Sequence, residues 1–197
     1  TASAPTNGMD YLLQADYAPQ RRLNMYWRLR YEEKLNNYAL NSVLPLLKEF
    51  RKASLRYQMI YTFGNFSTKN LIEINFTQTA TQAPVFGATA LQDVSYTFTR
   101  LPLKIDFRYQ FFDAGNYDNR FYLYEKDVLY AFSIPMFYGT GSRYYLNVRY
   151  DINRKLSVWF KAAQTKYADG RESVGSGNDL IIGNKKTDFR MLMRWEF

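Results

Sequence analysis

The 197-residue sequence contains neither cysteine nor histidine. Without cysteine it can form no disulfide and offers no thiolate to a metal. Without histidine it has no imidazole to serve as a general base or as a metal ligand. Hydrolases whose catalytic sets depend on histidine are therefore excluded, and we expect no catalytic residues, no metal and no cofactor.

The sequence also lacks any long hydrophobic run. A membrane-spanning helix needs about 20 consecutive apolar residues, and no stretch approaches that length. Helical periodicity is nearly absent, because the one candidate, residues 41–53, is interrupted by Pro45 and is expected to lie in a loop. Glycine and proline, at 10 and 6 residues, are too few for a low-complexity or collagen-like chain. These absences leave a chain built mainly from strands.

Aromatic residues and positive charge are the two excesses of this composition. The chain has 18 Tyr and 15 Phe, which favours strands, and its formal net charge is +8. Such a charge is typical of a protein with an anionic partner, such as nucleic acid or lipid phosphate, but it can also be a solubilising bias. The length fits one domain, so we treat residues 1–197 as a single unit.

Apolar and other residues alternate with a period of two over most of the chain, which is the pattern of half-buried strands. In 101–111, one face carries Leu101, Leu103, Ile105, Phe107, Tyr109 and Phe111, and the other carries Lys104, Asp106, Arg108 and Gln110. Similar segments are 10–17, 23–31, 55–63, 71–76, 93–98, 120–124, 128–134, 143–150, 156–162 and 189–197. The sequence therefore predicts an all-β fold, an antiparallel transmembrane β-barrel of about 10–11 strands, the number depending on whether a tight turn lies at Tyr124–Asp127.

The expected connections between these strands alternate between short and long. Long loops are expected near 32–52, 78–91 and 167–187. Short turns on one side and longer loops on the other are typical of outer-membrane barrels. Eleven is an odd number, whereas bacterial single-chain barrels normally have an even number of strands. We therefore expect residues 1–197 to form either one barrel domain or the C-terminal part of a larger barrel.

A soluble barrel would show the same alternation, with its apolar set turned inward. Two features favour a membrane barrel. Ten or eleven strands with large side chains exceed what a small soluble barrel encloses, and aromatic residues near strand ends would form interfacial girdles. The aromatic residues expected in these girdles are Tyr17, Tyr31, Phe63, Phe76, Tyr109, Phe111, Tyr150 and Tyr167.

The last ten residues, DFRMLMRWEF, place Phe189, Met191, Met193, Trp195 and Phe197 at every second position. This ending resembles the C-terminal signature of bacterial outer-membrane β-barrels. The resemblance implies that the last strand is recognised by the barrel-assembly machinery. More loosely, residues 117–160 are similar to the C-terminal barrel region of Bacteroidota outer-membrane proteins. The resemblance implies a bacterial outer-membrane location, with lipid, lipopolysaccharide and other outer-membrane or periplasmic proteins as partners.

The polar faces of the predicted strands would line the lumen and carry a basic excess. The lumen candidates are Arg28, Arg30, Arg56, Asp106, Arg108, Arg149, Arg190 and Arg194. A water-filled lumen with this charge would prefer anions. A ladder of ion pairs would instead plug the barrel and make it a structural, assembly or anchoring component. The sequence leaves both functions open.

Two other classes of function remain as alternatives. An outer-membrane enzyme could use carboxylates rather than histidine, and Asp106 and Glu73 are the inward candidates. A soluble basic barrel could bind an anionic ligand or nucleic acid. Binding of single strands combines basic and stacking groups on one surface, but here the arginines and aromatics fall mostly on opposite faces. We therefore expect a non-enzymatic outer-membrane pore or anchoring component with no specific nucleic-acid partner.

Overall fold

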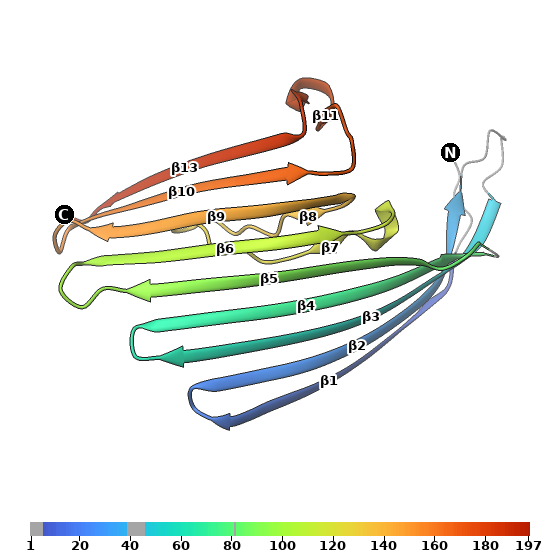
Figure 1. Cartoon of the computed structure of the whole chain (residues 1–197), viewed down its shortest axis with the longest axis horizontal. Helices are drawn as coiled ribbons and strands as arrows, with labels where there is room; N and C mark the ends of the chain where they lie inside the picture. Colours follow the sequence, from blue (N-terminus) through green and yellow to red (C-terminus); the bar gives the residue numbers. More distant parts are fainter. Residues whose placement is uncertain (1–5, 39–45, 81) are drawn as a thin grey trace.

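A computed structural model describes residues 6–38, 46–80 and 82–197. The described chain is dominated by one antiparallel sheet whose nine strands are arranged in chain order (Figure 1). The strands are β1 (Gly8–Gln20), β2 (Leu23–Tyr38), β3 (Leu46–Phe63), β4 (Phe66–Thr79), β5 (Val85–Thr97), β6 (Leu103–Asp113), β9 (Thr140–Asp151), β10 (Leu156–Tyr167) and β13 (Lys185–Trp195). The predicted all-β, antiparallel fold is confirmed.

The sheet is open, with β1 at one edge and β13 at the other. Within the described residues, β1 pairs only with β2, and β13 pairs only with β10. Both edge strands end at the side of the sheet where the tight connections lie, so they run in the same direction (Figure 1).

The tight connections all lie at one end of the sheet, at 21–22, 64–65, 98–102 and 152–155. In the turn between β3 and β4, Gly64 has a φ of +55°. A positive φ at the first central position suits a two-residue hairpin turn of type II′, where glycine is preferred because it has no Cβ.

Two loops predicted as long are much shorter than expected. Near 32–52, β2 continues to Tyr38 and β3 begins at Leu46, so most of that range is strand; near 78–91, only 80–84 lie between β4 and β5. These ranges were misread because they carry polar or small residues where the pattern calls for large apolar ones. Such residues still pair in a sheet when their side chains face solvent. Between β10 and β13, residues 168–184 contain β11 (Ser173–Val174), a 3₁₀ turn η2 (Gly177–Asp179) and β12 (Ile181–Ile182).

The predicted count of 10–11 wall strands is wrong, because residues 114–139 leave the wall. We call 114–139 the inward segment. It holds a 3₁₀ turn η1 (Tyr117–Asn119) and a short hairpin of β7 (Phe121–Tyr122) and β8 (Met136–Phe137), which lies against one face of the sheet beside β6 and β9 (Figure 1). The segments 120–124 and 128–134 thus do not form separate wall strands, and Tyr124–Asp127 is not the tight turn between two of them.

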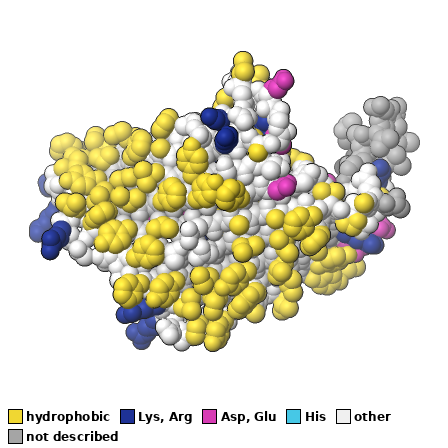
Figure 2. Space-filling model, in the orientation of Figure 1, with side chains coloured by type: hydrophobic (Ala, Val, Ile, Leu, Met, Phe, Trp, Pro, Cys, Tyr) yellow, Lys and Arg dark blue, Asp and Glu magenta, His cyan; other side chains and the backbone are white. Residues whose placement is uncertain are grey.

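The two faces of the sheet differ sharply in chemistry. We call the face covered by the inward segment the inner face and the opposite one the outer face. On the outer face, large apolar side chains remain exposed across every strand, and Figure 2 shows them gathered over the wall. On β2 the outer set runs from Leu23 to Tyr31, and charge appears there only beyond it, at Glu33. No helix of the described chain is both long and apolar enough to cross a membrane.

Candidate functional site

The inward segment is held first by a small apolar cluster on the inner face. Phe121, Leu123 and Phe137 of the segment are at most 3% exposed and pack with wall residues that include Phe112 and Tyr167. The ring centroids of Phe112 and Phe137 lie 5.2 Å apart. Tyr167 was predicted to lie in an outer aromatic girdle, and that prediction is wrong, because its ring is buried on the inner face.

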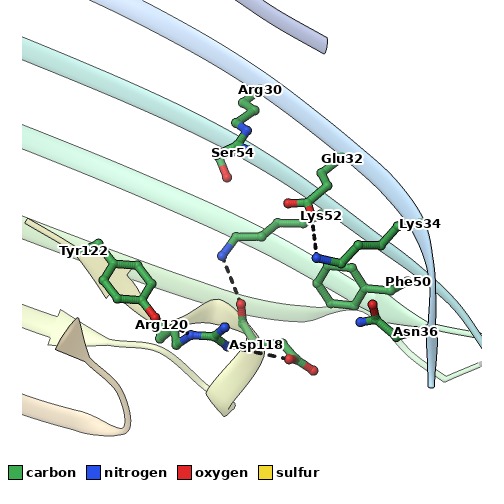
Figure 3. A pocket seen from close by; sticks show the side chains of 10 residues that line it. All are labelled: Arg30, Glu32, Lys34, Asn36, Phe50, Lys52, Ser54, Asp118, Arg120 and Tyr122. Carbon is green, nitrogen blue, oxygen red and sulfur yellow. Dashed lines mark hydrogen bonds and ion pairs between the residues drawn. The ribbon is translucent and has the colours of Figure 1, made fainter. Parts of the chain in front are cut away.

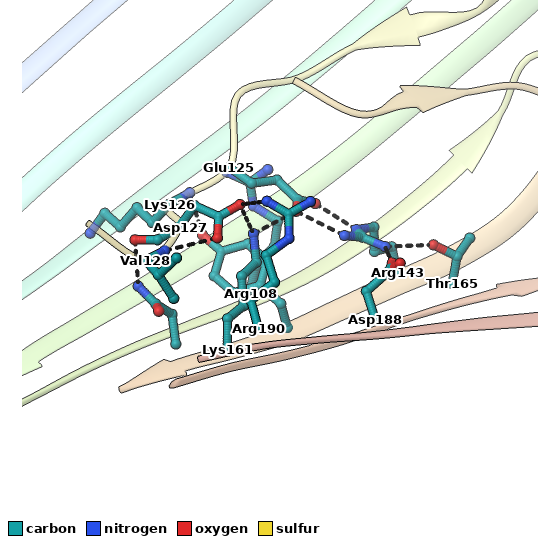
Figure 4. Close-up of polar contacts among 12 residues, drawn as sticks. Arg108, Glu125, Lys126, Asp127, Val128, Arg143, Lys161, Thr165, Asp188 and Arg190 are labelled. Atoms are coloured by element: carbon teal, nitrogen blue, oxygen red, sulfur yellow. Dashed lines mark hydrogen bonds and ion pairs between the residues drawn. The ribbon is translucent and has the colours of Figure 1, made fainter. Parts of the chain in front are cut away.

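A network of buried ion pairs forms the second and more specific attachment (Figure 4). Glu125 of the inward segment is fully buried, and its carboxylate accepts two hydrogen bonds from the Arg143 guanidinium, at 2.6 and 2.9 Å. The Lys161 ammonium lies 3.2 Å from the same carboxylate. Arg143 lies on β9 and Lys161 on β10, so one carboxylate joins the segment to two wall strands.

Asp127 extends this network to the last strand. Its carboxylate side chain is fully buried and accepts hydrogen bonds from Lys161 at 3.1 Å and from Arg190 of β13 at 2.5 Å. Its backbone carbonyl accepts a hydrogen bond from the Asn147 amide at 3.3 Å. The two carboxylates of the segment therefore pair with three wall cations.

Lys126 lies between Glu125 and Asp127 in the sequence, and in its contacts the segment supplies the cation and the wall supplies the carboxylate. Lys126 donates to the Asp106 carboxylate at 2.6 Å and also to the Ser95 hydroxyl. Beside it, the buried Arg108 of β6 donates to Asp93 of β5 at 2.7 Å. A carboxylate held by a two-pronged guanidinium contact is among the stronger and more directional hydrogen-bonded pairs in proteins.

All eight predicted lumen residues lie on the inner face, but the structure does not gather them into one site. Arg108, Asp106 and Arg190 belong to the buried network, while Arg56 pairs with Glu73 at 2.5 Å. Arg28 donates to Gln14, and Arg30 pairs with Asp10. Arg149 and Arg194 lie over the Trp159 ring, at 5.3 and 5.7 Å from its centroid, and pair with Asp151 and Glu196.

The carboxylates considered for catalysis are held separately. Glu73 pairs with Arg56 on β3, and Asp106 pairs with Lys126 of the inward segment. Among the described residues, no group of three or more acidic side chains is placed to hold a metal ion. Both carboxylates are held in ion pairs: Glu73 joins β4 to β3, and Asp106 holds the inward segment.

Sequence reasoning missed Glu125 and Asp127, the two residues that anchor the network. They fall in Tyr124–Asp127, where a tight turn was one of two alternatives, because the flanking 120–124 and 128–134 alternate as wall strands do. A usable signal was Gly87 within β5. A Cβ at Gly87 would lie 3.0 Å from the Asn119 Cβ, so the wall there accepts the inward segment at close range. A glycine inside a strand often marks such an approach.

A second contact lies outside the wall, where the end of the inward segment meets the start of the 168–184 connection. The Arg171 side chain donates to the Asp169 carboxylate through Nε at 2.8 Å and again through its terminal nitrogen. These hydrogen bonds hold the pKa of the Asp169 carboxyl below its ordinary value of 3.8. Gly139, with a φ of +72°, lies directly against this pair, and a Cβ there would collide with both side chains.

The last strand places its predicted assembly residues on the outer face. Phe189, Met191, Met193 and Trp195 are 61–72% exposed, and Phe197, beyond the end of β13, is fully exposed. Within the described residues, this strand also presents a free edge, since only β10 pairs with it. The strand β13 is therefore accessible both at its outer side chains and at its backbone edge.

An open antiparallel sheet with an apolar outer face and a polar inner face resembles part of an outer-membrane β-barrel. Two solved structures have similar folds. The fold is similar to CdiB from Acinetobacter baumannii, with a TM-score of 0.57 and 13% identity, covering 98% of this chain and 36% of that one. It also matches an anion-selective porin from Comamonas acidovorans, with a TM-score of 0.49 and 9% identity, covering 94% of this chain and 59% of that one.

These similarities concern the fold. No protein-family model matches the chain, and no curated protein matches its sequence. The chain spans about a third of the CdiB chain and less than two thirds of the porin chain. The predicted resemblance to outer-membrane barrels is confirmed at the level of fold, while the narrower resemblance to Bacteroidota proteins stays a prediction.

Proposed function

We propose that this chain forms nine wall strands of a larger β-barrel in a bacterial outer membrane, and that the barrel is a non-enzymatic pore narrowed by the inward segment. The observation that carries this proposal is the pairing of an apolar outer face with an inner face on which a chain segment is clamped by buried ion pairs. Lipid and lipopolysaccharide would contact the outer face.

The dimensions of the apolar outer face support a membrane location. On β2 the apolar stretch runs from Leu23 to Tyr31. At about 3.4 Å per residue this is about 27 Å along the strand, or about 21 Å across the membrane at a tilt of about 40°. Outer-membrane barrels have apolar bands of about 25 Å. Glu33 and its ion-pair partner Arg51 lie beyond this band, where water or head groups solvate them.

The inward segment supports a barrel larger than nine strands. A barrel of about eight strands has an interior just wide enough for its own side chains, which leaves no room for residues 114–139. In addition, β1 and β13 run in the same direction, so direct closure between them would be parallel, whereas an odd number of further strands restores antiparallel pairing throughout. Free strand edges are not stable in lipid, so both edges need partners.

Cysteine cross-linking tests the closure. The 197 residues contain no cysteine, so no native thiol of this chain competes with an introduced pair. Ala15→Cys with Trp27→Cys, a registered pair of β1 and β2, is the positive control. We expect that control to form a disulfide and Ala15→Cys with Met191→Cys, across the two edges, to form none. A disulfide between β1 and β13 would contradict the larger barrel.

Conductance tests the pore. The protein that carries this chain, reconstituted in planar bilayers, should show single-channel steps, and a salt gradient should give a reversal potential of the sign for anion preference, because the inner face is basic. Cation preference would contradict the basic lumen.

An assembly or anchoring component is the second candidate, and the buried ion-pair network favours it, because a tightly clamped segment can close a barrel. This function predicts correct insertion without conductance. Absence of channels in the unaltered protein, with channels appearing when Glu125 is replaced, would support a closed barrel over an open pore.

A further inference from the structure

A polar recess lies on the inner face between β2, β3 and the inward segment (Figure 3). It consists of two adjoining cavities of about 230 and 180 Å³. Both cavities are lined by Arg30, Lys52, Ser54, Arg120 and Tyr122. We call these five residues the basic recess. They comprise three cations and two hydroxyl groups. The charged lining also includes Lys34, Glu32 and Asp118 in the first cavity and Arg28, Arg56 and Glu73 in the second, so six cations face three carboxylates.

Lys52 is the central cation of the basic recess. Its ammonium donates to the backbone carbonyl of Asp118 at 2.9 Å, which fixes the side chain across the gap between β3 and the inward segment (Figure 3). Among the described residues, no carboxylate lies within ion-pair distance of it. An ammonium has three donors, and a partly buried charge with a single neutral acceptor is only partly compensated.

Arg120 reaches the recess from the inward segment. Its guanidinium donates to the Tyr122 hydroxyl at 2.9 Å and to the Tyr117 carbonyl at 3.0 Å, and its nearest carboxylate, that of Asp118, is 3.9 Å away. These neutral partners hold the guanidinium in place without cancelling its charge. Arg30 is the one cation of the five with a close carboxylate, Asp10, and both of those side chains are about half exposed.

This arrangement differs from the remainder of the inner face. In the buried network, Arg108, Arg143 and Lys161 each have a close carboxylate. In the basic recess, Lys52 has no carboxylate within ion-pair distance among the described residues, and the Asp118 carboxylate is as far as 3.9 Å from Arg120. These two cations and the Ser54 hydroxyl face the open space with a net positive charge around it. Pockets for drug-sized molecules measure about 300–1,000 Å³, so cavities of this size suit a small solute.

We infer that the basic recess binds a tetrahedral oxyanion, as free phosphate or as the phosphoryl group of a small solute. Ammonium, guanidinium and hydroxyl donors are the groups that bind phosphate oxygens in proteins. The inference rests on the proposed function only in placing the inner face in contact with water. Binding itself requires no conduction.

Calorimetric titration of the protein in detergent micelles, at low salt, tests the inference. Inorganic phosphate should bind, and Lys52→Gln should weaken the affinity at least tenfold. Lys155→Gln is the matched control, because it removes the same charge from a turn at the far end of the sheet. Arg120→Gln, on a different element, should also weaken binding and guards against misfolding of the first variant. Each variant is first checked for folding by its mobility in unheated gels.

The source of the oxyanion is distinguished by comparing inorganic phosphate, a hexose monophosphate and the unphosphorylated hexose. Tighter binding of the hexose monophosphate indicates a phosphorylated solute, and equal binding indicates the free anion. Binding of the hexose without phosphate overturns the inference. Equal weakening of phosphate binding by Lys155→Gln also overturns the inference, because it would indicate a diffuse charge effect. Absence of phosphate binding to the folded, unaltered protein overturns it as well. Phosphate binding without channels would leave the recess intact and contradict only the pore.

Discussion

Replacing Glu125 by glutamine tests whether the buried ion pairs hold the inward segment against the wall. The substitution keeps the size of the side chain but removes the charge that Arg143 and Lys161 face. Those two side chains are only 8% and 3% exposed, so they cannot recover hydration without movement. Breaking a buried pair by removing one partner costs about 3–5 kcal/mol. Because Lys161 retains Asp127, and Arg143 retains Thr165 and the Asp188 carboxylate at 3.5 Å, we take the lower value, about 3 kcal/mol.

This loss of stabilisation makes detachment of the inward segment easier and leaves the wall strands paired. A cysteine introduced as Leu123→Cys reports detachment, because Leu123 is 3% exposed and the chain has no other cysteine. If the thiol reacts with a maleimide only when the segment opens, about 3 kcal/mol raises the labelling rate about a hundredfold, at 1.4 kcal/mol for each factor of ten.

The matched control is Glu172→Gln, which removes the same charge from an exposed position in the 168–184 connection. It should leave the labelling rate within a factor of three. A hundredfold increase for Glu125→Gln should also coincide with a larger single-channel conductance. An increase below threefold would refute the reasoning, since the ion pairs of Glu125 would then contribute little to holding the segment.

Four further predictions follow from other parts of the chain. Gly139→Ala should expose residues 168–184 to protease, because its Cβ would displace the contact between Asp169 and Arg171. The folded pKa of Asp169 lies below 3.8, so its contact with Arg171 is intact above pH 3.8 and is lost as the pH falls through the folded pKa. Cleavage by pepsin within 168–184 should therefore become faster over that pH interval. The Asp169→Asn variant should be cleaved at the faster rate at every pH. Phe107→Arg, near the middle of the outer face, should cost about 2–4 kcal/mol in folding into lipid vesicles, whereas a variant that folds equally well would argue against a lipid-facing position. Deleting Phe197 should impair assembly in cells without changing folding into vesicles, because its side chain is fully exposed, and normal assembly in cells would count against the recognition signal.

The wall strands could be predicted from the sequence because each has one face in an apolar environment. Segment 101–111 is the clearest case, and β6 begins and ends within two residues of it. All eight lumen candidates lie on the inner face for the same reason, since a period of two fixes which side chains share a face.

The inward segment could not be predicted, because its alternation serves a different purpose. Phe121, Leu123 and Glu125 are buried against the wall, while Tyr122 and Tyr124 are exposed. A wall strand shows the same period, with lipid in place of the wall. Local periodicity records that one face is covered and does not record what covers it.

The ends of β2 and β3 were missed for a related reason. Glu33, Glu49 and Arg51 occupy outer positions where the alternation calls for apolar residues, so the sequence there was interpreted as a loop. The strands continue past the apolar band because backbone pairing does not require lipid on the outer face. The candidate site was thus only half predictable: its cations lie on regular strands, but the carboxylates that organise them lie on the segment that was misassigned.

The separation in sequence between the inward segment and its partners determines the order in which the structure can form. Wall strands pair with their neighbours in the chain, so hairpins close short loops first. The contacts of the inward segment with β6 and β9 are also close in sequence, since Lys126 and Asp106 are 20 positions apart and Glu125 and Arg143 are 18. Its contacts with β13 and β3 join residues much farther apart: Asp127 and Arg190 are 63 positions apart, and Lys52 and Asp118 are 66. Closing such long loops costs more entropy and is rewarded only after both sides exist. The inward segment is therefore expected to attach first to β6 and β9, and the interior reaches its final width only when β13 supplies Arg190.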